Sequence, residues 1–180
     1  MQGIRADRFK RIIVEIIPFL ILIVCIVLDQ VSKEFFHTLW DKKGSTTVIK
    51  NFFYLTYTVN TGAAWSFLAD VSWGQIFFKV LTCCSLVLFG FLYYYAFKNN
   101  YKWLKFSLAF VIGGTLGNFI DRLFLSGVVD FIGLIFGDYY FPIFNLADCF
   151  LTVGVIMLIV HFFFFDESAI FKKKNGNKNV

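Results

Sequence analysis

Four apolar segments, each long enough to cross a membrane, constrain the fold of this chain more than any other feature of its sequence. They cover about residues 12–29, 75–97, 103–124 and 145–165. A hydrocarbon core about 30 Å thick requires roughly 20 apolar residues per helix. Hydrophobic residues make up 58% of the chain, which is more than ordinary soluble domains contain. We therefore predict an all-α membrane protein with four transmembrane helices.

The lysines and arginines between these segments predict the orientation, because positive charge concentrates in cytoplasmic loops. Four lie before the first segment, three in the stretch 98–105 where the second and third segments meet, and four after the last: Arg5, Arg8, Lys10, Arg11; Lys98, Lys102, Lys105; and Lys172, Lys173, Lys174, Lys178. The first outer loop also contains lysines, so the bias is partial. We predict cytoplasmic termini, a single domain over 1–171 and a disordered basic tail over 172–180. The positive net charge therefore reflects topology and does not indicate nucleic-acid binding.

The two outer connections are expected to differ in structure. The stretch "TTVIKNFFYLTYTVN" in the loop 34–74 is rich in β-branched and aromatic residues with partial alternation, which favours short strands. We predict a small β-like platform resting on the outer leaflet. The connection 125–144 is apolar but interrupted by glycines, so we predict a segment that lies in the membrane interface.

The unusual polar residues fall at one depth, near the outer face of the membrane. They come from the first, third and fourth predicted helices and from the two outer connections: Asp29, Lys33, Asn60, Asn118, Asp121, Arg122, Asp130, Asn145 and Asp148. Charged groups near hydrocarbon are costly and usually face a protein interior or a cavity. Their concentration at one level therefore predicts a functional site.

Structural explanations remain open for several of these residues. An ion pair at the end of the first helix accounts for Asp29 and Lys33. Neutralisation by Arg122 accounts for Asp121. Asp148 taken alone fits an N-cap-like position at the start of the fourth helix. For Asp130 and Asp148 together, a purely structural role is the weaker explanation.

The available side chains favour acid–base chemistry by paired carboxylates. The chain contains no HExxH motif, and His37 and His161 are predicted on opposite membrane faces, so we expect no metal site. Ser32 and Lys33 are neighbours that point about 100° apart on a helix, which is poor geometry for a Ser–Lys dyad. Two aspartates can divide the work, one activating a water as a base and the other protonating a carbonyl oxygen. Asp130 and Asp148 are the best candidates for such a pair.

Five motifs, "DQVSK", "NTGAAWSF", "GGTLGNFIDR", "VVDFI" and "FNLADCFLTVG", together resemble the ordered motif series of the lipoprotein signal peptidase (signal peptidase II) family. The resemblance covers nearly the whole chain. It implies an aspartyl endopeptidase of the bacterial inner membrane that removes a signal peptide just before a diacylglyceryl-modified cysteine. It also implies sensitivity to globomycin-type peptides. Trp65 is a departure, because the family more often has phenylalanine there.

The same resemblance implies a role for each matched residue. Asp130 and Asp148 match the catalytic pair. Residues that match the substrate-binding positions are Asn60, Gly62, Asn118, Arg122 and Asn145. Residues that match supporting positions are Asp29, Lys33 and Asp121. We expect no cofactor, diacylglyceryl-prolipoprotein substrates, contact with membrane lipids and a monomeric state.

Two other classes of function fit the composition less well. A proton or cation transporter would need polar residues across the whole membrane, whereas the inner half of the last segment, "VGVIMLIVHFFFF", offers only His161. A scaffold protein would not need carboxylates gathered at one depth.

Overall fold

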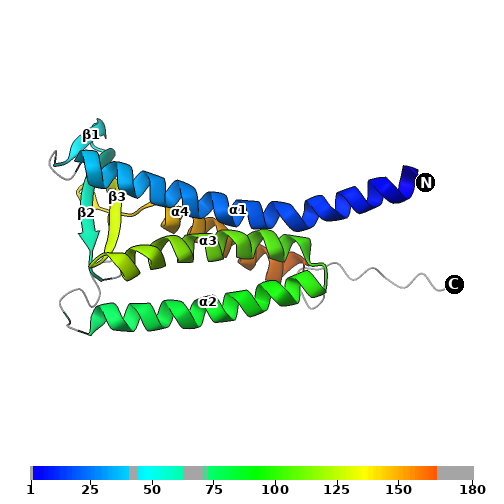
Figure 1. Cartoon of the computed structure of the whole chain (residues 1–180). Helices are drawn as coiled ribbons and strands as arrows, with labels where there is room; N and C mark the ends of the chain where they lie inside the picture. Colours follow the sequence, from blue (N-terminus) through cyan, green and yellow to red (C-terminus); the bar gives the residue numbers. More distant parts are fainter. Residues whose placement is uncertain (1, 41–43, 63–70, 72, 166–180) are drawn as a thin grey trace.

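The computed structural model describes residues 2–40, 44–62, 71 and 73–165. Four helices run lengthwise, and a small sheet lies at one end of them (Figure 1). The helices are α1 (Gln2–Trp40), α2 (Gly74–Lys98), α3 (Lys102–Phe124) and α4 (Leu146–Val160), and α4 continues into a π-helical turn, η2 (His161–Phe165). Trp65 and the predicted tail 172–180 lie outside the described residues.

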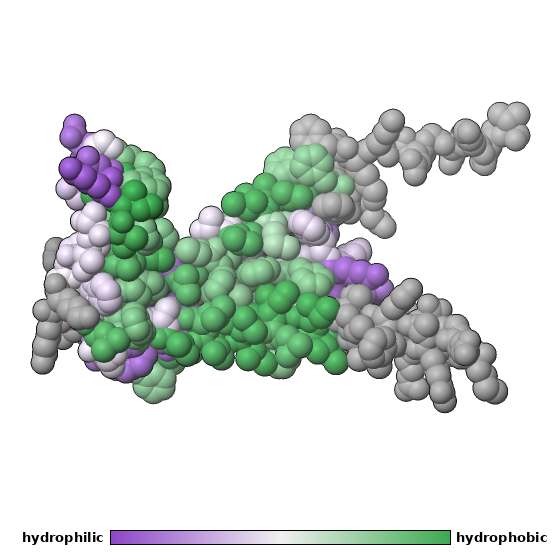
Figure 2. All heavy atoms as spheres, turned by 90° about the horizontal axis from the view of Figure 1, so that it is seen from above, coloured by the Kyte–Doolittle hydropathy of each residue, from purple (hydrophilic) through white to green (hydrophobic). Residues whose placement is uncertain are grey.

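The predicted four spans are confirmed. Each helix contains a stretch long and apolar enough to cross a membrane: Ile16–Trp40, Gly74–Lys98, Lys102–Phe124 and Leu146–Phe164. Apolar side chains dominate the surface over the helices, and hydrophilic residues gather toward the ends (Figure 2). On α2, for example, Val87 is 75% exposed and Phe91 is 65% exposed. Such a continuous apolar surface is expected where a protein faces lipid.

The end of the first span was placed wrongly. The sequence predicts that it ends near Asp29 and that the outer loop begins at residue 34, but α1 continues to Trp40. Asp29 and Lys33 therefore lie inside the helix, and both are almost completely buried. The helix can continue past these two charges because neighbouring elements supply partners for them.

Helix α3 is the centre of the bundle and contacts α1, α2 and α4. Its glycines permit this close packing. A Cβ atom on Gly114 would collide with the carbonyl oxygen of Ala147 on α4, and one on Gly117 would collide with the carboxylate of Asp29 on α1. Small residues commonly allow membrane helices to approach in this way. Gly117 therefore brings the buried charges of α1 against α3.

The antiparallel sheet has the order β1–β2–β3–β4. Its strands are β1 (Thr46–Ile49), β2 (Phe53–Asn60), β3 (Val128–Phe136) and β4 (Tyr139–Tyr140). The predicted strands in the first outer loop are thus confirmed as β1 and β2. The connection 125–144, predicted only as an interfacial segment, instead supplies two strands, and β3 pairs along β2 with Thr58 opposite Asp130. This pairing brings Asp130 to the helical bundle.

Candidate active site

A pocket of about 780 Å³ lies where the sheet meets the helices. Its wall combines residues of β2, β3, α2, α3 and α4. Six of the residues singled out in the sequence line it: Asn60, Gly62, Asn118, Arg122, Asp130 and Asp148. The remaining four, Asp29, Lys33, Asp121 and Asn145, are buried behind this wall. The structure therefore brings the predicted residues together and separates them into a lining set and a buried supporting set.

Asp148 is fixed at the start of α4 by a capping box. Asn145 is the N-cap, and its Oδ1 accepts a hydrogen bond from the backbone N–H of Asp148 at 3.0 Å. In return, Oδ2 of Asp148 accepts from the backbone N–H of Asn145 at 3.2 Å. The structural explanation for Asp148 is thus correct in part, with Asp148 at the third helical position and Asn145 at the cap itself. The positive end of the helix dipole also favours a carboxylate there.

Asn145 joins the two pocket carboxylates. Its side-chain amide Nδ2 donates to Oδ1 of Asp130 at 2.7 Å, while its backbone N–H holds Asp148. Nδ2 also lies 3.2 Å from the carbonyl oxygen of Val129 and 3.0 Å from Oδ1 of Asn118. Asn145 is fully buried. One residue therefore sets the position of Asp130 relative to Asp148.

Two further asparagines complete the support of the carboxylates. Nδ2 of Asn118 donates to Oδ1 of Asp148 at 2.8 Å. Nδ2 of Asn60 donates to Oδ2 of Asp130 at 3.1 Å, and Oδ1 of Asn60 accepts from the backbone N–H of Gly62 at 3.0 Å. All four carboxylate oxygens of the pair therefore accept hydrogen bonds, two of them from Asn145 and one each from Asn60 and Asn118.

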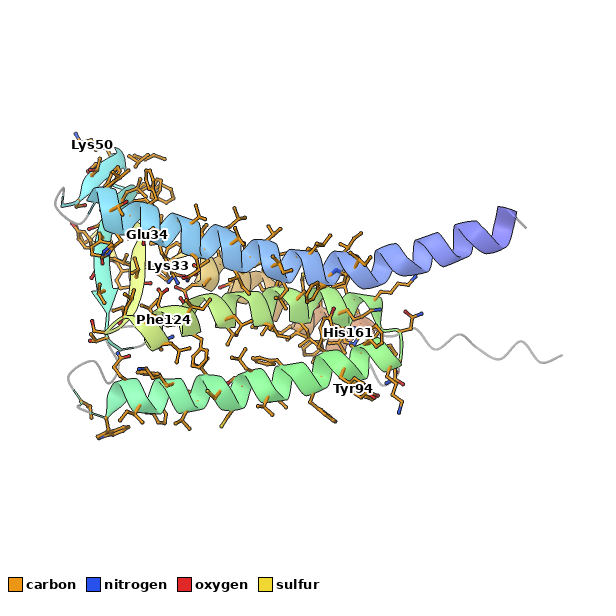
Figure 3. The ribbon with its side chains drawn as sticks, viewed as in Figure 1. Lys33, Glu34, Lys50, Tyr94, Phe124 and His161 are labelled. Atoms are coloured by element: carbon orange, nitrogen blue, oxygen red, sulfur yellow. The ribbon has the colours of Figure 1, made fainter. Side chains whose placement is uncertain are left out.

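Lys33 lies behind the asparagines and joins α1 to α3. Its Nζ is 2.8 Å from Oδ2 of Asp29 and 3.0 Å from Oδ2 of Asp121, and it donates to Oδ1 of Asn118 at 2.9 Å. Figure 3 labels Lys33 on α1 near the sheet end of the bundle. The predicted Asp29–Lys33 ion pair is confirmed. Because this ion pair is buried, it belongs to an internal hydrogen-bond network and is not a solvated pair at a helix end.

The two buried acids around Lys33 connect it to the backbone beside the pocket. Oδ1 of Asp29 accepts from the backbone N–H of Ala147, in the first turn of α4, at 2.9 Å. Oδ2 of Asp121 accepts from the backbone N–H of Val129 at 3.0 Å. Asp148 and Asp130 are each the next residue along the chain. The supporting set thus fixes the backbone immediately before Asp130 and Asp148.

Arg122 does not pair with Asp121 directly: it acts on Asp121 only at longer range, and the direct partner of Asp121 is Lys33. Among the described residues, both ion pairs within 4.0 Å involve Lys33, and Asp121 belongs to one of them. Adjacent residues on a helix point about 100° apart, so Asp121 faces α1 while Arg122 lines the pocket. Arg122 contacts the backbone of Asn118 through Nη1 at 3.4 Å.

Sequence reasoning also missed a supporting residue, Gln30. Its Nε2 lies 3.0 Å from Oδ1 of Asp121 and 3.1 Å from the carbonyl oxygen of Gly117. The only available signal was its place in "DQVSK", inside an otherwise apolar helix. His37 contacts Tyr57 of β2, whereas His161 begins η2 after α4. Among the described residues, no group of side chains is suited to a metal ion.

The electrostatic environment of Asp130 favours its neutral form. Burial raises its pKa from 3.8 to about 7, and repulsion from Asp148 acts in the same direction. The hydrogen bonds from Asn60 and Asn145 oppose this shift without cancelling it. Near pH 7, Asp130 is therefore able to hold or release a proton beside a second carboxylate.

We expect this shift to appear in the pH dependence of stability. Because the pKa of Asp130 is higher in the folded than in the unfolded chain, its contribution is fully present below about pH 4. It is lost as the pH rises through about 7, with a slope of up to about 1.4 kcal/mol per pH unit. Thermal unfolding of the detergent-solubilised protein between pH 4 and 8 measures this slope. The Asp130→Asn variant should be less pH-dependent than the wild type, and identical slopes would contradict the assignment.

Comparison with protein families gives a match over most of the chain. A family model described as signal peptidase (SPase) II matches residues 21–164. This range includes every residue of the pocket and of its supporting set.

Individual proteins of similar sequence share one description. The chain is 40% identical over 153 residues to a lipoprotein signal peptidase of Listeria welshimeri, covering 84% of this chain and 96% of that protein. It is 43% identical over 161 residues to a lipoprotein signal peptidase of Pseudomonas paraeruginosa, covering 87% and 91%. A solved bacterial membrane enzyme has a TM-score of 0.68 at 35% identity, over 79% of this chain and 85% of that chain.

Proposed function

The chain belongs to the signal peptidase II family, whose members are aspartic proteases that remove signal peptides from prolipoproteins, and from this premise we propose how it selects and cleaves its substrate. The substrate is a diacylglyceryl-modified prolipoprotein, and the bond cleaved is the one just before the lipidated cysteine. Asp130 and Asp148 form the catalytic pair. The observation that carries this proposal is their position on one pocket wall, joined through Asn145.

The surroundings of the two carboxylates assign their roles. Asp148 accepts two N–H hydrogen bonds at a helix N-terminus, an environment suited to a carboxylate that acts as the base. Asp130 lies on a buried strand where its pKa is raised to about 7, which suits a carboxylic acid that donates a proton. This division follows the general pattern of paired acids whose environments differ.

The reaction proceeds in two steps with balanced proton transfers. Asp148 takes a proton from a water molecule as the water oxygen attacks the scissile carbonyl carbon, and Asp130 gives its proton to the carbonyl oxygen. The carbon–nitrogen bond of the resulting gem-diol then breaks. Asp148 passes its proton to the departing nitrogen, which becomes the amino group of the lipidated cysteine, and Asp130 recovers a proton from a gem-diol hydroxyl. Both side chains end as they began, so the chemistry needs no cofactor.

The other pocket residues are assigned to substrate binding. Arg122 and the asparagines Asn60 and Asn118 offer N–H groups near the carboxylates, and Gly62 leaves room for an extended peptide beside β2. Asn145 acts from behind the wall by orienting the pair. The apolar part of the pocket, which includes Leu134, Phe136 and Phe141, provides a surface compatible with lipid chains.

The proposed location is the bacterial cytoplasmic (inner) membrane, with both termini in the cytoplasm, the pocket near the outer leaflet and a monomeric chain among lipids. The multi-pass character itself follows from the four spans. The basic loop between α2 and α3 lies at the opposite end of the bundle from the sheet (Figure 1). Positive charge at that end supports its cytoplasmic placement.

Labelling of single introduced cysteines tests this orientation. Cysteines at Thr47 and Asp138, both at the sheet end, should react with a membrane-impermeant reagent added to intact protoplasts. A cysteine at Lys102 should react only after the membrane is opened. Reaction of the Lys102 position in intact protoplasts would invert the topology and place the pocket at the wrong leaflet.

A cleavage assay tests the proposed substrate. The purified protein in detergent is given a prolipoprotein carrying a diacylglyceryl group on the cysteine, and the same prolipoprotein without the lipid. We expect the lipidated form to yield a product that begins at the modified cysteine and the other form to remain largely uncut. Equal cleavage of both forms would remove lipid recognition from the proposal, and a different cleavage point would remove the predicted specificity.

A further inference from the structure

Arg122 has an unusual set of contacts for a cation beside two acids. It shares the pocket wall with Asp130 and Asp148, but within the described residues its guanidinium makes no ion pair within 4.0 Å. Its Nη1 makes one long hydrogen bond, 3.4 Å, to the carbonyl oxygen of Asn118. Its Nε is buried without a hydrogen-bond partner in the part of the chain that the structure describes. At longer range the carboxylates of Asp148, Asp130 and Asp121 attract the guanidinium, so a competing interaction is needed to keep it from pairing with them.

That interaction is with Phe78 on α2. The guanidinium carbon Cζ lies 5.4 Å from the centroid of the Phe78 ring. This is within the distance at which a cation is attracted to an aromatic face, and the attraction is stronger when water is excluded. Phe78 is only 7% exposed, so the ring is held against the bundle and not free to follow lipid motion. The ring provides a partner that is attractive but carries no charge.

The identity of this partner matters for the chemistry. If Arg122 paired with Asp148, the positive charge would oppose the transfer of a proton to that carboxylate, and the guanidinium would occupy the space of the attacking water. Guanidinium and carboxylate groups form strong bidentate pairs, so the arrangement without a pair requires a competing contact. Phe78 supplies that contact from a different helix.

Resting on the function proposed above, we propose that Phe78 is a positioning residue for Arg122. Its ring holds the guanidinium against α2, so that Arg122 faces the pocket as a hydrogen-bond donor for the substrate backbone and leaves Asp148 free to act as the base. Phe78 itself touches neither the substrate nor the reacting atoms in this scheme. Its effect on cleavage passes through Arg122.

A double-mutant cycle on the cleavage rate tests this coupling. Phe78→Leu keeps an apolar side chain but removes the aromatic face, and we expect kcat/KM to fall about 3- to 30-fold. Phe78→Tyr keeps the face and should retain most of the rate. In an Arg122→Ala background, Phe78→Leu should have almost no further effect, because the residue it positions is gone. Phe91→Leu, on the lipid-exposed surface of the same helix, is the matched control and should resemble the wild type.

Two results would overturn the proposal. One is a Phe78→Leu enzyme as fast as the wild type. The other is a Phe78→Leu substitution that lowers kcat/KM by the same factor in the Arg122→Ala background as in the wild type. That result would mean that Phe78 only packs α2 against α3. A thermal-unfolding cycle on the same four proteins measures the Phe78–Arg122 coupling without any substrate. Failure of the wild type to cleave lipidated prolipoprotein would overturn the proposed function, while this second cycle would still decide whether the contact holds Arg122.

Discussion

Asp148→Asn and Asp130→Asn variants are expected to fold and to enter the membrane, yet to cleave lipidated prolipoprotein at least about 100-fold more slowly than the wild type. Positioned acid–base groups typically contribute about 100- to 10,000-fold each. Asparagine has nearly the shape of aspartate but cannot accept or donate the proton that the reaction moves. In Asp148→Asn no base activates the water, and in Asp130→Asn no acid protonates the carbonyl oxygen.

The stability of these variants must be measured alongside their rates. Asp148 also takes part in the capping box of α4, and loss of a capping contact typically costs about 1 kcal/mol. A small fall in unfolding temperature is therefore expected and does not explain a large loss of rate. Asp138→Asn is the matched control, because Asp138 is an exposed aspartate in the turn between β3 and β4. It should cleave at the wild-type rate, and a folded Asp148→Asn or Asp130→Asn variant that did the same would refute the assignment of that residue.

Replacing Lys33 with methionine is expected to produce the largest loss of stability. The substitution removes one cation that pairs with both Asp29 and Asp121 and donates to Asn118. Methionine fills a similar volume but leaves two buried carboxylates without a counter-charge. Breaking a buried ion pair by removing one partner typically costs about 3–5 kcal/mol. Because Asp29 and Asp121 hold the backbone beside the catalytic pair, the remaining folded protein should also cleave poorly.

Thermal unfolding in detergent measures this effect, and the amount of folded protein after purification gives a second readout. Lys50→Met provides the control, since Lys50 is an exposed lysine at the turn between β1 and β2 (Figure 3). It should change the unfolding free energy by no more than about 0.5 kcal/mol. A Lys33→Met protein as stable as the Lys50→Met protein would show that the buried network does not hold the fold together.

The sequence was sufficient to predict the helices because hydrocarbon leaves the backbone few alternatives. The bounds of α2 and α3 differ from the predicted spans by at most one residue at each end. The convergence of polar residues was also predictable, because helices of known direction place Asp29, Asn118 and Asp148 at one depth. From the helix positions and the common depth of the polar residues, the sequence predicts that Asp130 and Asp148 share one site.

What the sequence could not supply was the partners of individual side chains across the fold. Strand β3 pairs with β2 across about 70 residues of chain, and the local pattern "VVDFIGLIF" does not indicate such a distant partner. Lys33 meets Asn118 and Asp121 on α3, so α1 continues beyond Asp29 with the charges of both Asp29 and Lys33 buried. The same absence of tertiary information led to the incorrect pairing of Asp121 with its neighbour Arg122.

The role of Asn145 shows a similar limit. The resemblance to the family implies that Asn145 binds substrate. In our proposal it acts on the substrate indirectly, by orienting Asp130 and Asp148. In the structure it is fully buried, caps α4 and contacts Asp130, all through one short side chain. A sequence motif shows that an asparagine stands at this position but not that it both caps α4 and contacts Asp130.

The central claim is that Asp130 and Asp148 act on one peptide bond as a single unit, and the double variant Asp130→Asn/Asp148→Asn tests it most directly. Residues that act as a unit show strongly non-additive losses, because removal of either one already disables the shared step. The measurement is the single-turnover rate of lipidated prolipoprotein cleavage by the wild type, both single variants and the double variant, each confirmed to be folded. The account predicts that the double variant is about as slow as either single variant. If the fold-loss of rate in the double variant equals the product of the two single fold-losses, the two residues act independently, and the shared step is contradicted.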